Sequence, residues 1–179
     1  KVAPVEISGA VITSATLHNQ DEIDKKDIRI GDAVIIQRAG DVIPKVVKTI
    51  ISKRPKKTKK YLLPKFCPVC NELANKMENE AVLRCQNYHC NAQIKGRIKH
   101  FISKEGIDVD GFGDKLVEQL VDKKILKNIS DIFHLQEHQL AELDRMGDKS
   151  AANIIMAINE AKEKKLSKFI NGLGIRNVG

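Results

Sequence analysis

Hydrophobic residues follow two different patterns along the chain. Between residues 5 and 51 they form short β-rich runs, at 11–13, 33–36 and 42–51, separated by turn-forming residues, which predicts strands. From Asn91 onward they recur at helical spacing. Four stripes have this spacing: Ile94, Ile98, Phe101 and Ile102; Leu116, Val117, Leu120 and Val121; Ala151, Ile154, Ile155, Ile158 and Ala161; and Leu166, Phe169, Ile170 and Leu173. We expect all four stripes to be core, in a helical part that follows a β-rich part.

A short helix is predicted inside the β-rich part. Asn19 stands three residues before Glu22, and the apolar Ile23 follows, which is the arrangement of a capping box at a helix start. Gly40-Asp41 predicts a hairpin. Several short strands with one small helix are typical of a compact barrel such as an OB-fold, although the hairpin says nothing about barrel closure.

The chain is basic, and its positive charge is concentrated. Thirty-one Lys and Arg residues against 23 Asp and Glu give a net charge of +8, and 42% hydrophobic residues indicate a folded protein. Residues 42–71 contain nine bases and no acid. This run is either a solvated linker or a stripe that faces phosphates, and both can hold at once. An aromatic content of 4% without Trp argues against stacking platforms for single-stranded bases.

The sequence contains no segment typical of a membrane-spanning or exported protein. It has no run of 18 apolar residues, and residues 1–6 form neither an apolar signal core nor a transit pattern. We therefore expect a protein of a reducing compartment, with no membrane partner.

The spacing of the four cysteines is a strong signal for a metal site. Cys67-x-x-Cys70 is followed after fourteen residues by Cys85 and then by Cys90. Two such knuckles let four thiolates converge on one Zn²⁺ at about 2.3 Å each, with a loop or hairpin between them. We predict one structural zinc without an open position for catalysis; the alternatives are His89 replacing a cysteine as ligand, and disulfides or no metal at all. Zinc on four thiolates would change the formal charge from +8 to about +6.

Three similar turns lie roughly 32 to 34 residues apart, at 109–113, 143–147 and 175–179. In the first, Gly111 and Gly113 allow a tight turn that presents backbone N–H groups at a helix start, which suits a DNA phosphate. The second and third have Arg145 and Asn177 where the first glycine would be. The recurrence predicts helix-hairpin-helix units that hold the DNA backbone without reading its sequence.

These motifs, in this order, resemble the carboxyl-terminal half of a bacterial NAD⁺-dependent DNA ligase. The resemblance rests on the cysteines and on segments 15–19, 21–23, 27–32, 38–44, 84–85, 90–93, 98–101, 108–113 and 173–176. It implies a multidomain α and β chain: an OB-type β-barrel with the basic connector (1–62), a zinc module (63–92) and an all-α helix-hairpin-helix domain (93–179). In that family, the three modules together encircle duplex DNA at a nick.

The resemblance also implies which residues contact DNA, and that this segment contains no catalytic residue. Arg38, with Val42 and Ile43, would lie close to the nick. The full set of expected DNA contacts is Arg38, Val42, Ile43, Lys45, Gly111, Gly113, Gly147, Lys149, Ser150 and Arg176. No catalytic residue is expected here, because Asp110-Gly111 supplies only the end of the family's Lys-x-Asp-Gly motif and Asp108 stands in the lysine position.

The expected protein is therefore a fragment that is inactive alone. NAD⁺ and Mg²⁺ would serve the full-length enzyme and bind mainly outside this segment, on an adenylation domain that precedes Lys1. The barrel would lack its first strand, and the last hairpin would be truncated. The expected partner is nicked duplex DNA. The protein is expected to be a monomer in the bacterial cytoplasm, at the nucleoid. A stand-alone zinc and helix-hairpin-helix scaffold is the alternative, and association with RNA is a weaker one.

Overall fold

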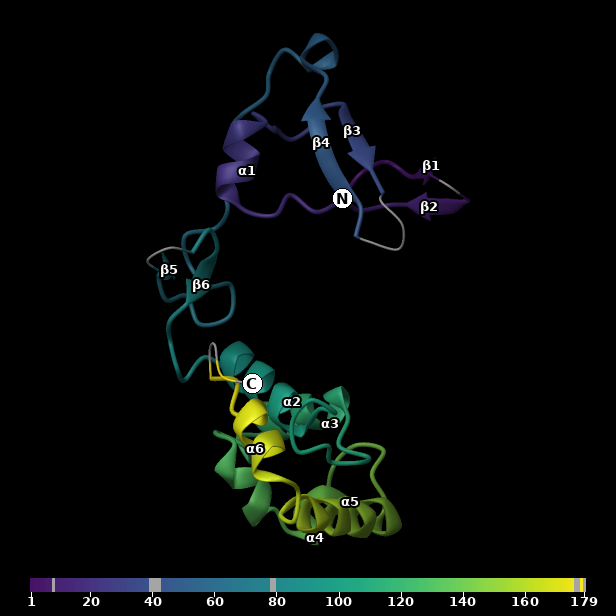
Figure 1. The fold of residues 1–179 in the computed structure, drawn as a ribbon, viewed down its shortest axis with the longest axis vertical. Coiled ribbons are helices and arrows are strands. Elements are labelled where there is room, and N and C mark those ends of the chain that lie inside the picture. The colour runs from purple at the N-terminus through teal and green to yellow at the C-terminus, as the bar shows by residue number, and fades with distance from the viewer. Residues whose placement is uncertain (8, 39–42, 78–79, 176–177, 179) are drawn as a thin grey trace. The chain divides into compact units, whose positions relative to one another are not determined.

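The computed structural model describes residues 1–7, 9–38, 43–77, 80–175 and 178. These residues form two compact units, one of residues 1–68 and 72–86, the other of residues 69–71 and 87–179 (Figure 1). The first unit holds all the described strands, and the second holds the helices from α2 onward.

Short antiparallel pairs make up the β-structure of the first unit. β1 (Val5–Ile7) pairs with β2 (Ala10–Ile12), and β3 (Val34–Gln37) pairs with β4 (Lys45–Thr49). The predicted strands at 11–13 and 33–36 are confirmed to within a residue or two, whereas β1 was not predicted. Gly40 and Asp41, the predicted hairpin turn, lie outside the described residues, but the strands that flank them pair antiparallel as expected. Within the described residues, these two sheets are two-stranded, so no continuous ladder closes a barrel.

The single helix of the β-rich region forms where its cap predicts. α1 (Gln20–Lys25) begins after Asn19, whose side chain accepts a 2.9 Å hydrogen bond from the Glu22 backbone N–H. Ile23 on α1 is 2% exposed and packs with Ile28 and Val46. Because this core has only three buried residues among those that the structure describes, apolar burial alone stabilises the unit weakly, and polar contacts gain importance.

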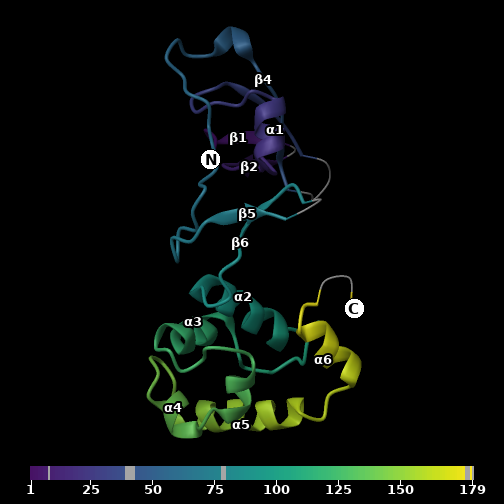
Figure 2. The same ribbon diagram turned by 90° about the vertical axis from the view of Figure 1, so that its left-hand side faces the viewer.

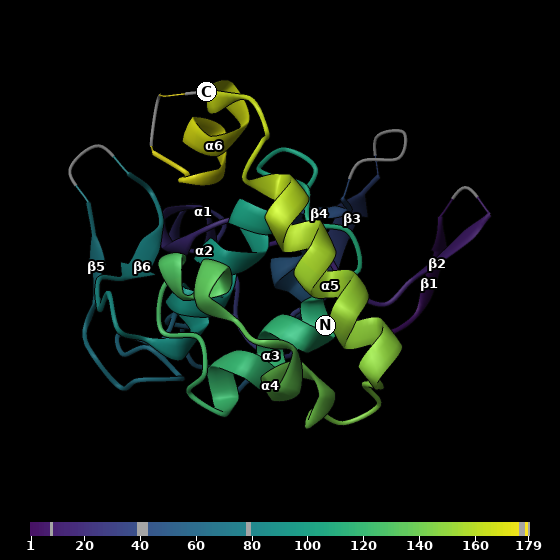
Figure 3. The ribbon, with the colours of Figure 1, turned by 90° about the horizontal axis from the view of Figure 1, so that it is seen from below.

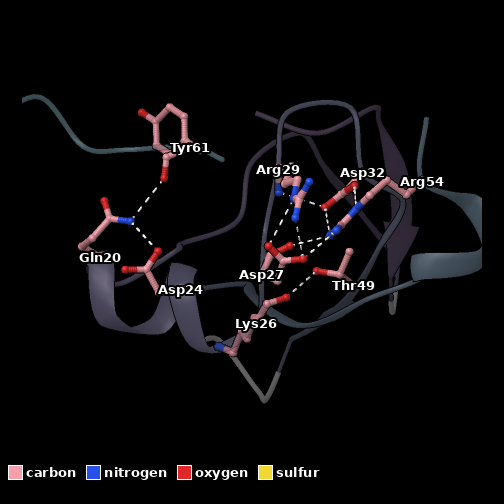
Figure 4. A network of polar contacts seen from close by, with 9 residues as sticks. All are labelled: Gln20, Asp24, Lys26, Asp27, Arg29, Asp32, Thr49, Arg54 and Tyr61. Carbon is pink, nitrogen blue, oxygen red and sulfur yellow. Dashed lines mark hydrogen bonds and ion pairs between the residues drawn. The ribbon is translucent and has the colours of Figure 1, made fainter. Parts of the chain in front are cut away.

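Arg54, in the basic run of residues 42–71, forms an ion network with Asp27 and Asp32 of the same unit (Figure 4). Its guanidinium contacts Asp27 at 2.6 Å and Asp32 at 2.8 Å, and it also donates to the Asp27 backbone carbonyl. Arg29 contacts Asp27 at 3.2 Å. The Asp32 side chain is 1% exposed, and the hydrogen bond from Arg54 lowers its pKa against the opposing effect of burial. Arg54 therefore belongs to a structural network, and not to the solvated or phosphate-facing run in which the sequence placed it.

This network predicts a specific loss of stability in acid. The pKa values of Asp27 and Asp32 are lowered in the folded protein, chiefly by hydrogen bonds from Arg54. The network thus contributes fully above the unfolded-state pKa of about 4, and its contribution is lost as the pH falls through the lower folded-state values. Thermal unfolding at a series of pH values should show a steeper loss of stability below about pH 4 in the wild type than in Asp32→Asn.

A matched control is available in the same unit. Glu6→Gln removes an exposed carboxylate from β1. This variant should lose thermal stability below about pH 4 as steeply as the wild type. An equally steep loss of thermal stability below about pH 4 in the wild type and in Asp32→Asn would contradict the role given to the network.

A small hairpin lies between the two cysteine pairs, as predicted. β5 (Ala74–Lys76) pairs antiparallel with β6 (Leu83–Cys85). Lys76 on β5 makes a 2.8 Å ion pair with Asp21 on α1, which is a contact within the first unit. The connector that leads to this hairpin includes the 3₁₀ turn η1 (Ile51–Lys53).

The helices of the second unit pack in two groups (Figures 2 and 3). α2 (Asn91–Ile102) packs against α3 (Asp114–Asp122) and α6 (Leu166–Gly172), and α4 (Glu137–Ala141) packs against α5 (Asp148–Ala161). Figure 3 views this unit with α5 in the foreground. The first three hydrophobic stripes are confirmed as core, with Ile155 only half-buried. α4 and the 3₁₀ helix η2 (Ser130–His134) were not predicted, because neither is long enough to show a helical repeat.

The fourth stripe was wrongly predicted to be core. Leu166 is 72% exposed, Phe169 40% and Leu173 37%, while Ile170 is half-buried. The described contacts of α6 with α2 centre on Phe101: the Phe169 ring meets the Phe101 ring edge to face, with centroids 5.7 Å apart, and Gly172 is buried beside Phe101. The amphipathic pattern correctly indicates a helix, but it does not determine how much of its apolar face is covered.

Candidate zinc centre and nucleic-acid interface

The structure brings the four cysteines together. Their Sγ atoms all lie within 4.8 Å of one another, Cys67 and Cys90 are buried, and none is in a disulfide. His89 is not part of this group. Four thiolates that converge from two tight turns fit a tetrahedral Zn²⁺ and leave no ligand position for water, as expected of a structural site.

The local backbone explains how each knuckle presents its cysteines. The Cys67 N–H donates to the Glu72 carbonyl at 2.8 Å, and Asn71 has a φ of 58°, so the chain turns sharply after Cys70. In the second knuckle, the Cys90 N–H donates to the Asn87 carbonyl at 3.1 Å. Cys90 is also the N-cap of α2, which ties this ligand directly to the helical unit.

The first glycine turn has the conformation that its sequence predicts. Gly111 has a φ of 73°, in the left-handed region that favours glycine. Val109 and Phe112 are each 5% exposed and fix the turn from beneath. Gly113 is the N-cap of α3 with φ −80°, and no side chain caps the helix. A Cβ at Gly113 would meet nothing within 4 Å, so neither backbone conformation nor packing requires a glycine there.

The second turn has the same conformation despite a different residue. Arg145 has a φ of 62°, close to that of Gly111, and Gly147 is the N-cap of α5 without a side-chain cap. A Cβ at Gly147 would again meet nothing within 4 Å. Lys149 and Ser150 are exposed in the first turn of α5. Arg145 therefore keeps the turn, and the space in front of both helix starts is open.

Gln119 connects the second turn to α3, and the sequence did not point to it. Its side-chain amide on α3 accepts from the Asp144 N–H at 3.0 Å and donates to the Asp144 carbonyl at 3.3 Å. This pair of bonds holds the second turn beside α3. A polar residue between two apolar stripe positions carries no sequence signal for such a contact.

The remaining predicted DNA contacts lie in three different settings. Ile43 is 72% exposed, and Lys45 is exposed on β4. Arg38 is half-buried, and its side chain is not free, because it takes part in an interaction within the protein. Val42 and Arg176 lie outside the described residues. No helix among the described residues is long and apolar enough to cross a membrane.

Comparison with known proteins identifies two domains. Residues 1–58 match the NAD-dependent DNA ligase OB-fold domain, and residues 66–92 match the NAD-dependent DNA ligase C4 zinc finger domain. The chain is 47% identical over 176 residues to a DNA ligase of Desulforapulum autotrophicum and 48% identical over 180 residues to one of Coxiella burnetii. These alignments cover 98% and 100% of the chain, but the chain spans only 26% and 27% of those relatives.

Fold and site thus define a protein with an OB-fold domain followed by a structural C4 zinc finger. Both domains match those of NAD-dependent DNA ligases, and nearly the whole chain is similar to about a quarter of such enzymes. The resemblance and the structural zinc predicted from the cysteine spacing are confirmed.

Proposed function

We propose that this chain is the DNA-clamping segment of an NAD⁺-dependent DNA ligase, which seals nicks in duplex DNA during replication and repair. The observation that carries the proposal is the match of two consecutive segments of one chain to two domains of this enzyme. The segment does no chemistry alone in this proposal. An adenylation domain of the same protein supplies the nucleophilic lysine and binds NAD⁺ and Mg²⁺.

The two glycine turns support helix-hairpin-helix units in the helical region. Gly113 and Gly147 stand at helix starts where no side chain caps the N–H groups and where a methyl group would touch nothing in the protein. A helix start that keeps its N–H groups open and its approach free of side-chain atoms suits a phosphate oxygen. Lys149 adds positive charge beside the second turn.

The proposed arrangement uses three modules with the boundaries 1–62, 63–92 and 93–179. Arg38, Val42, Ile43 and Lys45 of the OB domain act near the nick. The turns hold the backbone at a distance from it, with Arg176 in the third. The exposed lysines of the connector add non-specific attraction, without Arg54, which is engaged by Asp27 and Asp32. We further propose a monomer in the bacterial cytoplasm, at the nucleoid.

Binding of the zinc-loaded chain to a nicked duplex at increasing salt tests this proposal. If four phosphates are neutralised, affinity should fall about a hundredfold between 50 and 200 mM salt. Gly113→Ala should leave the melting temperature nearly unchanged, because the methyl group meets no protein atom, but should weaken binding about tenfold. Unchanged affinity in Gly113→Ala and Gly147→Ala would remove the turns from the interface.

A charge-matched pair of variants tests the second turn. Lys149→Glu and Lys162→Glu make the same change at opposite ends of α5, about 20 Å apart at 1.5 Å per residue. Only Lys149→Glu should weaken duplex binding strongly. Equal effects would indicate diffuse attraction without a specific contact at the turn, and tighter binding to RNA than to nicked duplex would overturn the proposal. So would a complete gene without a Lys-x-Asp-Gly motif upstream of Lys1.

A further inference from the structure

Arg97 lies on the same face of α2 as the zinc ligand Cys90. The two residues are seven positions apart, which is close to two helical turns. The Arg97 guanidinium carbon lies 3.9 Å from the centroid of the Tyr88 ring. Its Nη2 donates a 2.6 Å hydrogen bond to the Tyr88 backbone carbonyl. One side chain of the helix therefore holds both the ring and the backbone of the residue two positions before the ligand.

The segment held by Arg97 is itself a tight turn. Asn87 accepts from the Cys90 N–H with its carbonyl, at 3.1 Å, and from the His89 N–H with its side-chain oxygen, at 2.8 Å. The Tyr88 and His89 rings meet edge to face, with centroids 5.9 Å apart. Both hydrogen bonds close the turn on Asn87, so Tyr88 and Cys90 belong to one compact turn of four residues.

The helix that carries Arg97 is rigidly seated. Ile94 is 6% exposed and Ile98 is fully buried, so the residues beside Arg97 are fixed in the helical core. Tyr88, in contrast, is 64% exposed, so burial does not fix its position. Arg97 connects Tyr88 of this turn to the buried framework of α2.

We propose that Arg97 is a positioning residue for the zinc site, which keeps the Cys90 thiolate at the metal and slows zinc release. Release of a bound zinc would be faster if the turn at 87–90 could move the Cys90 thiolate away from the other three cysteines. Arg97 restrains that movement at two points. Partners outside the ligand set commonly change metal affinity by about 10- to 100-fold.

Zinc release from the loaded full chain to a coloured chelator such as 4-(2-pyridylazo)resorcinol tests the proposal. Arg97→Met keeps the length of the side chain but removes its charge and hydrogen bonds, and should release zinc about tenfold faster. Arg97→Lys keeps a cation over the ring and should lie between Arg97→Met and the wild type. Tyr88→Leu keeps the backbone carbonyl and should also be intermediate, because only the ring contact is lost.

Lys95→Met is the matched control. It removes one positive charge from the same helix, where Lys95 contacts Asp122 at 2.8 Å, and it should release zinc at the wild-type rate. Equal release rates for Arg97→Met and Lys95→Met would overturn the proposal. So would loss of the far-UV helical signal of Arg97→Met before the metal leaves, since Arg97 would then act through helix stability. These readouts do not involve DNA, so they stand or fall separately from the proposed function.

Discussion

Chelation of zinc is expected to unfold the region of the four cysteines and leave the helical core folded. From Cys67 to Cys90, the only buried residues among those described are these two cysteines, so this region has no apolar core to retain its structure. Structural zinc contributes about 10 to 16 kcal/mol to the folding of comparable small modules. The helical core contains no cysteine, and the far-UV helical signal should largely persist.

Limited proteolysis measures the unfolding of the four-cysteine region directly. Chelation should open cleavage sites at Lys76 and Arg84 inside the segment 66–92 and at Lys65 immediately before it, all of which zinc should protect. Cys70→Ser should show the same cleavage without a chelator, because three thiolates hold zinc more weakly. Protection that is unchanged after complete removal of the metal would mean that zinc contributes no stability to this module.

Phe101→Ala is expected to be among the most destabilising single substitutions in the helical unit, at about 3 to 5 kcal/mol. Phe101 is fully buried, and its ring meets Phe133 of η2 and Phe169 of α6 at centroid distances of 6.0 and 5.7 Å. Its removal leaves a cavity where three elements meet. Because domains are typically stable by only about 5 to 15 kcal/mol, the loss should be visible in denaturant unfolding followed by the helical signal.

The control for this cavity is an exposed apolar residue. Met156 on α5 is 62% exposed, and Met156→Ala should change stability by no more than about 0.5 kcal/mol. α6 should also loosen in Phe101→Ala, since Phe169 loses its ring contact, and hydrogen exchange on α6 would report this. A loss below about 1 kcal/mol would show that the neighbouring side chains close the cavity.

Local patterns predicted much of the fold. Asn19 caps α1 because its side-chain oxygen accepts from the Glu22 N–H, an interaction within four consecutive residues. Ile98 and Leu120 are fully buried because helical periodicity places each on an apolar face. Gly111 adopts a left-handed conformation that a glycine before a helix favours. In each case, the physical cause lies within a few residues, so the sequence is sufficient.

The candidate sites divide in the same way. The cysteine spacing was enough to predict a zinc site, because two short loops can bring four thiolates together with few alternatives. The glycine pattern was enough to locate the turns, but only the packing around Gly113 and Gly147 shows that nothing in the protein requires a glycine there. Arg54 and Arg97 resembled the other basic residues, and their partners emerge only when distant segments meet.

What the sequence determined by itself was the change from a β-rich to a helical part, the zinc ligands and the place of the first two turns, because these depend on spacing over a few residues. The tertiary structure decided the rest. It placed Arg54 against Asp27 and Asp32 and left most of the apolar face of α6 exposed. Whether a charge is paired or a stripe is covered depends on which surfaces lie opposite it. That is a property of the packed chain, not of any local pattern.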